Sequence, residues 1–435
     1  MKIIRILILL VFASAFVVPS FDEETQPFLD KSATPLHLWV QFQENPSREA
    51  VISWTTTVPG ERHVLYYDSI PRNSRTRDYR FRSNRIHSGE FTISQEEIPM
   101  ETWYHHAYIN GLEPDTFYYV TVETDGEVLG EYHFKTAPED DSPVSVLIGG
   151  DSRIASGVTD PENPRVKMNL VMRDLMLQDP RIVGLAHTGD YSDRARWSDL
   201  YFWLTDYFEN STTPEGRLLP IFPSQGNHDL RIGFQEIFWW PERENFFYYT
   251  AHINDSTALL VLNTEISLNG DQRTWLEAEL KELDPETNSL AALFHRGAFP
   301  SVKAYEDGAP RRRSWVPLFE EYELDFVVSG HGHSLKRTLP ILNLEPSPEG
   351  IIYLGDGGLG VRPRKVDRNR WYLEGRAMAE SISNVHLVQY QEEAIKIQAV
   401  GIDGEVVDSI NIPRDRRLRE AYYEELLPKE EPPVF

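Results

Sequence analysis

The chain has 435 residues, and none of them is cysteine. This absence excludes disulfide bonds, a thiolate nucleophile and zinc held by thiolates. Stability must therefore come from packed apolar side chains, and the hydrophobic content of 40% is enough for two cores. Any bound metal ion must be held by oxygen atoms and imidazole nitrogens.

Positive charge is also scarce. The 43 Lys and Arg residues stand against 68 Asp and Glu residues, which gives a formal net charge of −25 at pH 7. Because so large an acidic excess disfavours contact with a phosphate backbone, we expect no nucleic-acid partner. A local group of cations can still receive a small phosphorylated substrate.

Long apolar runs are missing except at the start of the sequence. Lys2 and Arg5 precede a short apolar run that ends near Ser20, which is the pattern of a secretory signal peptide over residues 1–20. The run is short for a bilayer span, so an uncleaved anchor is the weaker alternative. We therefore expect an exported protein (periplasmic, extracellular or cell-surface) without a stable membrane span in the mature chain.

Residues 35–137 contain short runs in which apolar and polar side chains alternate, separated by turn-forming residues. This alternation is typical of strands that bury one face. A series of such strands without intervening helices predicts an all-β sandwich. The runs begin at Leu36, Ala50, His63, His105, Phe117 and Tyr132.

From Val144 onwards, continuous apolar strands alternate with helical patterns, such as Met168, Val171, Met172 and Leu175 on one helix face. Strands that are apolar on both faces need helices to cover them. We therefore predict a layered α/β domain over residues 143–412, with two β-sheets flanked by helices. Residues 413–435 are predicted to form a charged C-terminal helix and tail.

Five of the apolar strands are followed by residues that can bind metal ions. Each group alone has an ordinary explanation, as a turn or as a hydrogen-bonded histidine. Their joint occurrence, in order and each after a strand, indicates a single site at the carboxyl edge of the sheets. The groups are Asp151 in GGDSR, Asp190 in TGDYSDR, Asn227 and His228 in GNHD, His295 in FHRG, and His331 and His333 in GHGH.

These residue types suit a pair of metal ions. A carboxylate can bridge two ions, while neutral imidazoles and an amide oxygen leave part of the positive charge uncancelled. The remaining charge would convert water to a hydroxide nucleophile near neutral pH and would neutralise phosphoryl oxygens. The pattern therefore predicts a metal-dependent phosphoester hydrolase.

With these motifs, the segments VISWTT, YHHAYINGLEPDTFYYVTV, QRTWLEAEL and YLGDGGLG make the chain resemble the calcineurin-like metallophosphoesterases. It is most similar to their purple acid phosphatase-like branch, which carries an N-terminal fibronectin-like domain. The resemblance extends over residues 35–412. It implies a fibronectin III-like sandwich for residues 35–137, followed by the metallophosphoesterase domain.

The resemblance also implies two divalent or trivalent metal ions (iron, zinc or manganese), with Asp190 as the bridging ligand. His228 would act as a general acid or bind phosphate, because the leaving alkoxide needs a proton. The other implied ligands are Asn227, His295 and His331 for one ion, and Asp151 and His333 for the second.

Two positions depart from the family pattern. Many relatives have a histidine two residues after the first aspartate, where this chain has Arg153, which cannot bind a metal ion but can bind phosphate. Purple phosphatases have a tyrosine three residues after the bridging aspartate, where this chain has Asp193, with Tyr191 displaced towards Asp190. We therefore expect a colourless enzyme whose second metal site, beside Arg153, is the weaker one.

Asp193 has two possible roles. It could complete the metal site of Asp151, or it could hydrogen-bond His228 as a dyad, which we favour from the similar GDxxDR stretch of metal-dependent protein phosphatases. That similarity would also bring Arg194 to the phosphate. Arg296 is a weaker candidate for the same task, because a salt bridge would equally explain it.

The sequence thus favours an exported phosphomonoesterase. A phosphodiesterase or nucleotidase on the same metal centre is the nearest alternative, because substrate choice depends on loops such as residues 300–314. A degenerate, non-catalytic binding protein is the alternative of a different class.

Overall fold

The computed structural model describes residues 31–92, 101–153, 162–193, 197–231, 233–240, 247–283, 289–355 and 357–428. Residues 1–20, with the expected signal peptide, lie outside this range, as do Arg194 and residues 429–435. Within the described part of the chain, every helix falls short of the length and apolarity needed to cross a bilayer.

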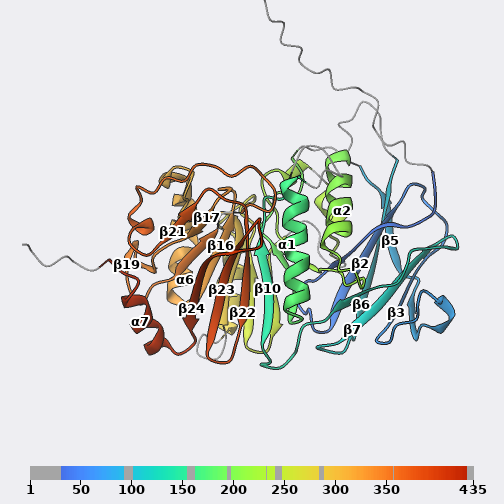
Figure 1. The fold of residues 1–435 in the computed structure, drawn as a ribbon, viewed down its shortest axis with the longest axis horizontal. Helices are drawn as coiled ribbons and strands as arrows, with labels where there is room; N and C mark the ends of the chain where they lie inside the picture. The colour runs from blue at the N-terminus through green and yellow to red at the C-terminus, as the bar shows by residue number, and fades with distance from the viewer. Residues whose placement is uncertain are drawn as a thin grey trace, which may run out of the picture.

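The expected strands form a β-sandwich at the N-terminal side of the structure, blue to cyan in Figure 1, although its first two strands, at residues 36–41 and 49–56, are buried on both faces rather than on one. Trp54, Leu65 and Val120 come from three of its strands and are fully buried. The predicted all-β fold of this part is confirmed. One sheet contains β1 (Leu36–Gln41), β2 (Glu49–Thr56), β5 (Ile86–Glu90) and β6 (Trp103–Asn110), and the other contains β3 (His63–Asp68), β4 (Phe81–Ser83), β7 (Phe117–Thr124), β8 (Glu127–Val128) and β9 (Tyr132–Lys135).

The rest of the chain forms two sheets with helices on their outer faces, as the sequence predicts. The first continues the sheet of β1 and β2, and the second has seven strands. The first contains β10 (Val144–Gly149), β11 (Ile182–His187), β12 (Ile221–Pro223), β22 (Asn384–Tyr390), β23 (Ala394–Gly401) and β24 (Val406–Pro413). The second contains β13 (Tyr249–Asn254), β14 (Thr257–Val261), β15 (Ser289–Arg296), β16 (Phe326–Gly330), β17 (Leu335–Arg337), β20 (Ile352–Gly355) and β21 (Met378–Glu380), and β18 (Ile341–Leu342) pairs with β19 (Glu345–Pro346).

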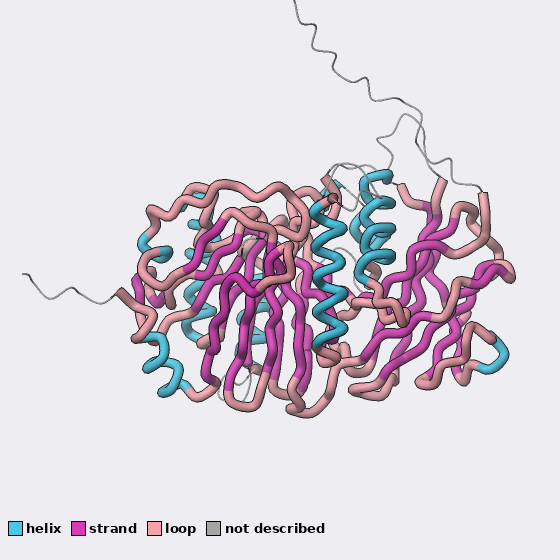
Figure 2. Tube along the Cα trace, viewed as in Figure 1, coloured by secondary structure: helices cyan, strands magenta, loops and turns pink. Residues whose placement is uncertain are grey.

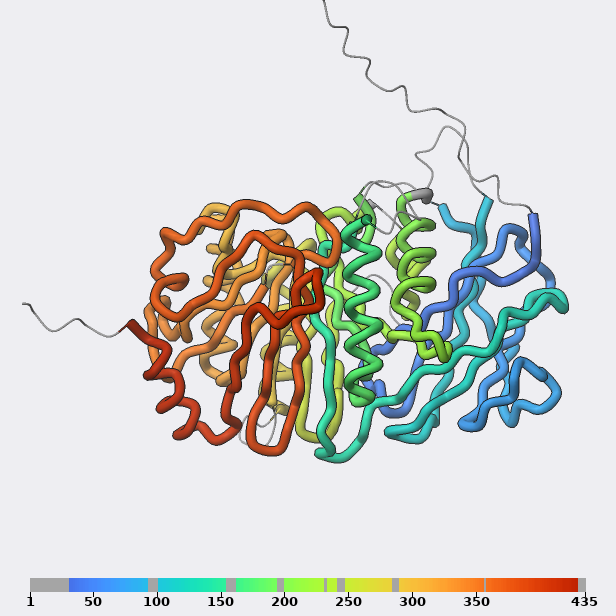
Figure 3. Tube along the Cα trace, in the orientation of Figure 1, coloured from blue at the N-terminus to red at the C-terminus, as the bar shows by residue number. Residues whose placement is uncertain are grey.

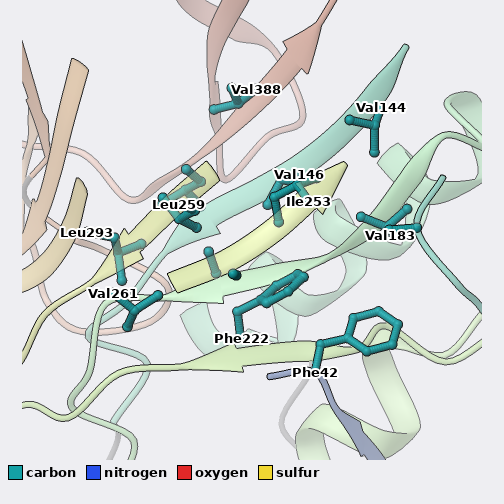
Figure 4. Close-up of a cluster of buried hydrophobic side chains, with 14 of the residues drawn as sticks. Phe42, Val144, Val146, Val183, Phe222, Ile253, Leu259, Val261, Leu293 and Val388 are labelled. Atoms are coloured by element: carbon teal, nitrogen blue, oxygen red, sulfur yellow. The ribbon is translucent and has the colours of Figure 1, made fainter. Parts of the chain in front are cut away.

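Apolar side chains fill the space between these two sheets. Figure 4 shows Val146 of β10 near Ile253 of β13 and Leu259 of β14, all of which belong to one buried cluster. Each of the three exposes at most 1% of its surface. Because both inner faces are buried, the strands are apolar without alternation, which explains the pattern that the sequence shows.

Helices cover the outer faces of the two sheets. Met168 and Met172 of α1 (Pro164–Gln178) pack in the same buried cluster as Leu147 of β10. The helix begins after Asn163, whose side chain accepts a hydrogen bond from the backbone N–H of Arg165 and caps the first turn. The other helices are α2 (Trp197–Ser211), α3 (Phe234–Ile237), α4 (Asp271–Glu282), α5 (Ala309–Ser314), α6 (Val316–Glu321) and α7 (Arg416–Glu424). Figure 2 shows α1 and α2 between two groups of strands in that view.

The sandwich and the α/β part share one continuous sheet, which the sequence pattern does not reveal. β1 pairs in parallel with β12, and the backbone N–H of Phe42 donates to the carbonyl of Ile221 at 2.9 Å. In Figure 3, the orange-red β22 lies beside the teal β10, although they are far apart in the sequence. The core is therefore assembled from long-range pairings.

Candidate metal centre

The two sheets bring together the strand ends that carry the predicted ligands. Parallel pairing aligns β10 with β11 and β12, and β14 with β15, β16 and β20. Four ligand candidates have a left-handed backbone: φ is 55° at Asp151, 65° at Asp190, 70° at His331 and 58° at His333. This conformation costs free energy in non-glycine residues and is concentrated at functional sites. The backbone geometry is therefore independent support for a site here.

Two glycines make room for the carboxylate of Asp151. A β-carbon on Gly330 would lie 2.7 Å from Oδ2 of Asp151 and 2.6 Å from Oγ1 of Thr188. Gly357 has a φ of 87°, and a β-carbon there would collide with the same carboxylate. Larger residues at these two positions would displace Asp151, which explains the glycines in GHGH and YLGDGG.

Asp190, His295 and His331 form a close group of potential ligands. One ligand atom from each lies within 4.8 Å of the others. Nδ1 of His295 donates to the carbonyl of Thr188 at 2.9 Å, so the Nε2 of the neutral ring carries a lone pair. That atom lies 3.1 Å from Oδ1 of Asn227 and 3.4 Å from Oδ1 of Asp190. Three acceptors that face one another fit a bound cation.

The charges of this group also suit a metal ion. Burial would raise the pKa of Asp190, but His295 and the backbone N–H of His228 outweigh it and lower the pKa to about 2. Burial, together with His295 and Arg296, lowers the pKa of His331 to about 2. For His295, burial acts downwards, but Asp190 and Asp151 outweigh it and raise the pKa. The carboxylate of Asp190 is thus ionised and the imidazole of His331 is neutral, which are the forms that bind a metal ion. The raised pKa of His295 means that a metal ion would have to displace a proton from its Nε2.

Asp151 and His333 form the other half of the centre. Oδ1 of Asp151 lies 3.2 Å from Nε2 of His333, yet both atoms are buried and neither has a hydrogen-bond partner within the described residues. Oδ2 of Asp151 accepts from the backbone N–H of His331 at 2.7 Å, which orients the carboxylate. Buried polar atoms without partners are rare and call for an ion or water. The pair therefore fits a second cation.

Arg153 lies against the carboxylate of Asp190. Its Nε donates to Oδ2 of Asp190 at 3.2 Å, and its Nη1 forms an ion pair with the carboxylate of Asp193. The guanidinium therefore bridges the carboxylates of Asp190 and Asp193. Only 12% of the Arg153 side chain is exposed, so its charge acts within the site rather than in bulk solvent.

His228 and Asp193 are in contact, but not as the favoured dyad. Nδ1 of His228 donates to the backbone carbonyl of Asp193 at 2.8 Å, while the Asp193 carboxylate pairs with Arg153. His228 therefore contacts the backbone of Asp193 rather than its carboxylate, because that carboxylate pairs with the neighbouring guanidinium of Arg153. The bond still fixes Nδ1 as the protonated atom of the neutral ring, and Nε2 lies 4.0 Å from Oδ2 of Asp190.

Two further residues of the centre were missed from the sequence. Asp229 accepts from the backbone N–H groups of Gly226, Asp190 and Tyr191 at 2.7–2.9 Å, and so ties two ligand loops together. Its position directly after Asn227 and His228 was the available signal. Arg364 donates to the carbonyl of His331 at 3.0 Å. No pattern around Arg364 marks it, because a distant loop brings it here.

Tyr191 and Arg296 both have other partners than a metal ion. The Tyr191 ring stacks on His187 at 3.8 Å and is completely buried, and burial raises the pKa of its phenol. Arg296 forms a bidentate ion pair with Glu265, at 2.8 and 3.2 Å, which was the alternative explanation for it. Its Nη1 also lies 3.4 Å from Nε2 of His331.

Comparison with known families agrees with this architecture. Residues 164–335 match the family described as calcineurin-like phosphoesterase, which defines the class of the α/β part. Residues 35–136 match the family described as purple acid phosphatase, N-terminal domain. The chain therefore combines a domain like the N-terminal domain of purple acid phosphatases with a domain of the calcineurin-like phosphoesterase family. The resemblance inferred from the motifs is confirmed.

Individual relatives are distant. An uncharacterized protein of Mycobacterium tuberculosis is 27% identical over 70% of this chain and 62% of its own length. Purple acid phosphatase 21 of Arabidopsis thaliana is 28% identical over 58% of each chain. The chain thus spans about three-fifths of the length of these relatives. The structure of purple acid phosphatase PPD1 from yellow lupin seeds matches 92% of this chain and 77% of its own, with a TM-score of 0.72 and 17% identity, and so shares the fold.

Proposed function

We propose that the chain is a metal-dependent phosphoester hydrolase that acts on phosphomonoesters. The observation that carries this proposal is the convergence of potential metal ligands from both sheets on a group that includes the buried Asp190 and His295 and the half-buried His331. Membership of a phosphoesterase family supports the same reaction. Export, as the N-terminal pattern suggests, would direct the activity to phosphate esters outside the cytoplasm.

The donor set fits two divalent or trivalent ions, such as iron, zinc or manganese. Asp190 would bridge them, and no thiolate competes for softer metals. When bound, two such ions would activate water and neutralise the charge of the phosphoryl oxygens. We infer that Asn227, His295 and His331 hold one ion, and that Asp151 and His333 hold the other.

The chain's own residues would orient the substrate and move the proton. Arg153 can exchange its bond with Asp190 for bonds to phosphate oxygens, because a guanidinium matches that geometry. His228 has its Nδ1 proton committed to the Asp193 carbonyl, so Nε2 of the doubly protonated ring is the atom that would deliver a proton to the leaving oxygen. Arg194 lies outside the described residues and remains only a sequence-based candidate.

Cationic side chains favour a monoester over a diester. A phosphomonoester carries up to two negative charges near neutral pH and a diester carries one, so each nearby cation stabilises the monoester more strongly. Arg153 and Arg364 both lie at this centre, because Arg153 bonds the carboxylate of Asp190 and Arg364 donates to the carbonyl of His331.

Hydrolysis of an aryl phosphate, an aryl phosphodiester and a nucleotide by one metal-loaded preparation tests the proposal. We expect fastest turnover of the aryl phosphate, loss of activity with a chelator, and recovery when metal is returned. Faster turnover of the diester or nucleotide would establish the alternative substrate class. Absence of both metal and turnover would leave a non-catalytic binding protein.

A further inference from the structure

A cavity of about 220 Å³ opens directly beside the candidate metal centre. The ligand candidate His331 forms part of its wall, together with the neighbouring Gly330 and Gly332. The cavity is smaller than the roughly 300–1,000 Å³ of pockets that enclose drug-sized ligands. Its size suits one compact group of a substrate rather than a large organic moiety.

Three cationic residues line this cavity: Arg296 at the end of β15, Lys303 in the following loop and Arg311 in α5. Asp307 lines it as well, and Glu265 neutralises Arg296 through their ion pair. The cations still exceed the carboxylates by one charge. In a chain of net charge −25, a local excess of positive charge at this position points to an anionic ligand.

Arg311 is held with its charge only partly satisfied. Its side chain donates to the carbonyls of Gly297 and Asp307, and the residue is 8% exposed. Its Nε is buried and has no hydrogen-bond partner among the described residues. Burial, followed by the repulsion of Arg296 and Arg312, lowers the pKa of Arg311 to about 10. An anion in the cavity would accept a hydrogen bond from the guanidinium and would offset the repulsion between the arginines.

Lys303 and Arg296 line the cavity, and Arg296 also reaches the candidate metal centre. Within the described part of the chain, Nζ of Lys303 has no hydrogen bond or ion pair, so it is available to a ligand. Nη1 of Arg296 lies 3.4 Å from Nε2 of His331. A substrate with one phosphate at the metal centre can therefore place a neighbouring group in the cavity.

We propose that this cavity binds a second phosphate group of the substrate, so that the enzyme prefers organic compounds with two or more phosphates. The inference rests on the proposed phosphoester hydrolysis. In that reaction, water adds its oxygen to phosphorus, the ester P–O bond breaks, and the leaving oxygen takes a proton. Lys303 and Arg311 bind the phosphate that is not cleaved and thereby set substrate preference.

The test compares kcat/KM for fructose 1,6-bisphosphate with that for fructose 6-phosphate. We expect the wild-type protein to prefer the bisphosphate. Lys303→Ala and Arg311→Lys should each reduce that preference by about tenfold, because each variant loses one charge-assisted hydrogen bond. Arg313→Ala is the matched control, because Arg313 lies in the same helix but is exposed. An unchanged preference in Lys303→Ala would overturn the proposal, and this variant removes a side chain with no described partner.

A binding experiment separates this proposal from the proposed function. Inorganic pyrophosphate is titrated by calorimetry into protein kept in a chelator, so that no metal ion contributes. We expect Lys303→Ala to weaken binding by about tenfold and Arg313→Ala to leave it unchanged. If the wild-type protein hydrolyses neither sugar phosphate, the proposed function fails, and this titration alone decides whether the cavity binds phosphate. Equal binding by the wild type and Lys303→Ala would exclude it.

Discussion

His106, in β6, offers a quantitative test of how the fold responds to pH. Its Nε2 lies 3.2 Å from the carbonyl of Glu236 and its Nδ1 lies 2.7 Å from the hydroxyl of Ser53. A carbonyl only accepts, so Nε2 carries the proton and Nδ1 accepts from the hydroxyl. Burial, followed by the influence of His87, lowers the pKa of His106 to about 3. A second proton would break the bond from Ser53.

The sign of the effect follows from these pKa values. An unfolded histidine titrates near pH 6.5, so below that pH the unfolded chain gains a proton that the folded chain refuses. The stability present above pH 6.5 is therefore lost as the pH falls, until the folded ring titrates near pH 3. At pH 5 the loss from His106 is about 2 kcal/mol, because about 1.5 pH units lie between 5 and 6.5. His37 and His105 are buried with low pKa values and act in the same direction.

The assay is the free energy of unfolding by urea at pH 8 and pH 5, followed by tryptophan fluorescence. We expect His106→Gln to lose about 2 kcal/mol less than the wild type between these pH values. His252→Gln is the control, because His252 is exposed, and it should lose as much as the wild type. An equal loss in His106→Gln and the wild type would refute the reasoning.

Three other predictions concern the metal centre. His228→Asn should lower kcat about 10²–10⁴-fold for an alkyl phosphate and less for p-nitrophenyl phosphate, whose leaving group needs no proton; equal losses on both would exclude a general acid. Asp229→Asn should weaken metal binding in titrations about 10–100-fold, since it loosens the loops of Asp190 and Asn227, and unchanged affinity would show that Asp229 has no such role. Iron-loaded protein should be colourless in visible spectra, because the Tyr191 phenol is buried among aromatic rings that include Trp203 and Phe238; a phenolate-to-iron band would contradict its placement.

The fold was largely predictable because burial leaves a periodic trace in the sequence. Trp54 and Val120 fall on short strands bounded by turn-forming residues, and Val146 lies in a continuous apolar one, so both architectures could be recognised. The pairing of β1 with β12 could not, because it depends on a contact between segments far apart in the chain. Periodicity reports which face is buried but not which strand is the neighbour.

The candidate site was predictable to the extent that its residues follow strands. The parallel order of β10, β11 and β12 carries Asp151 and Asp190 to one edge without any information from loops. The contact between Asp193 and His228 was expected through a carboxylate, but Arg153 competes for that group. Lys303 and other cavity residues lie in loops, whose course depends on packing that no local pattern encodes.

The number of metal ions bound per chain tests the central claim most directly. After incubation with iron, zinc and manganese and removal of free metal, we expect elemental analysis to find two ions per wild-type chain. Asp190→Asn removes the bridging charge and should lose at least one of them, together with phosphate release from an aryl phosphate. Wild-type protein that binds no metal ion under these conditions would contradict the account.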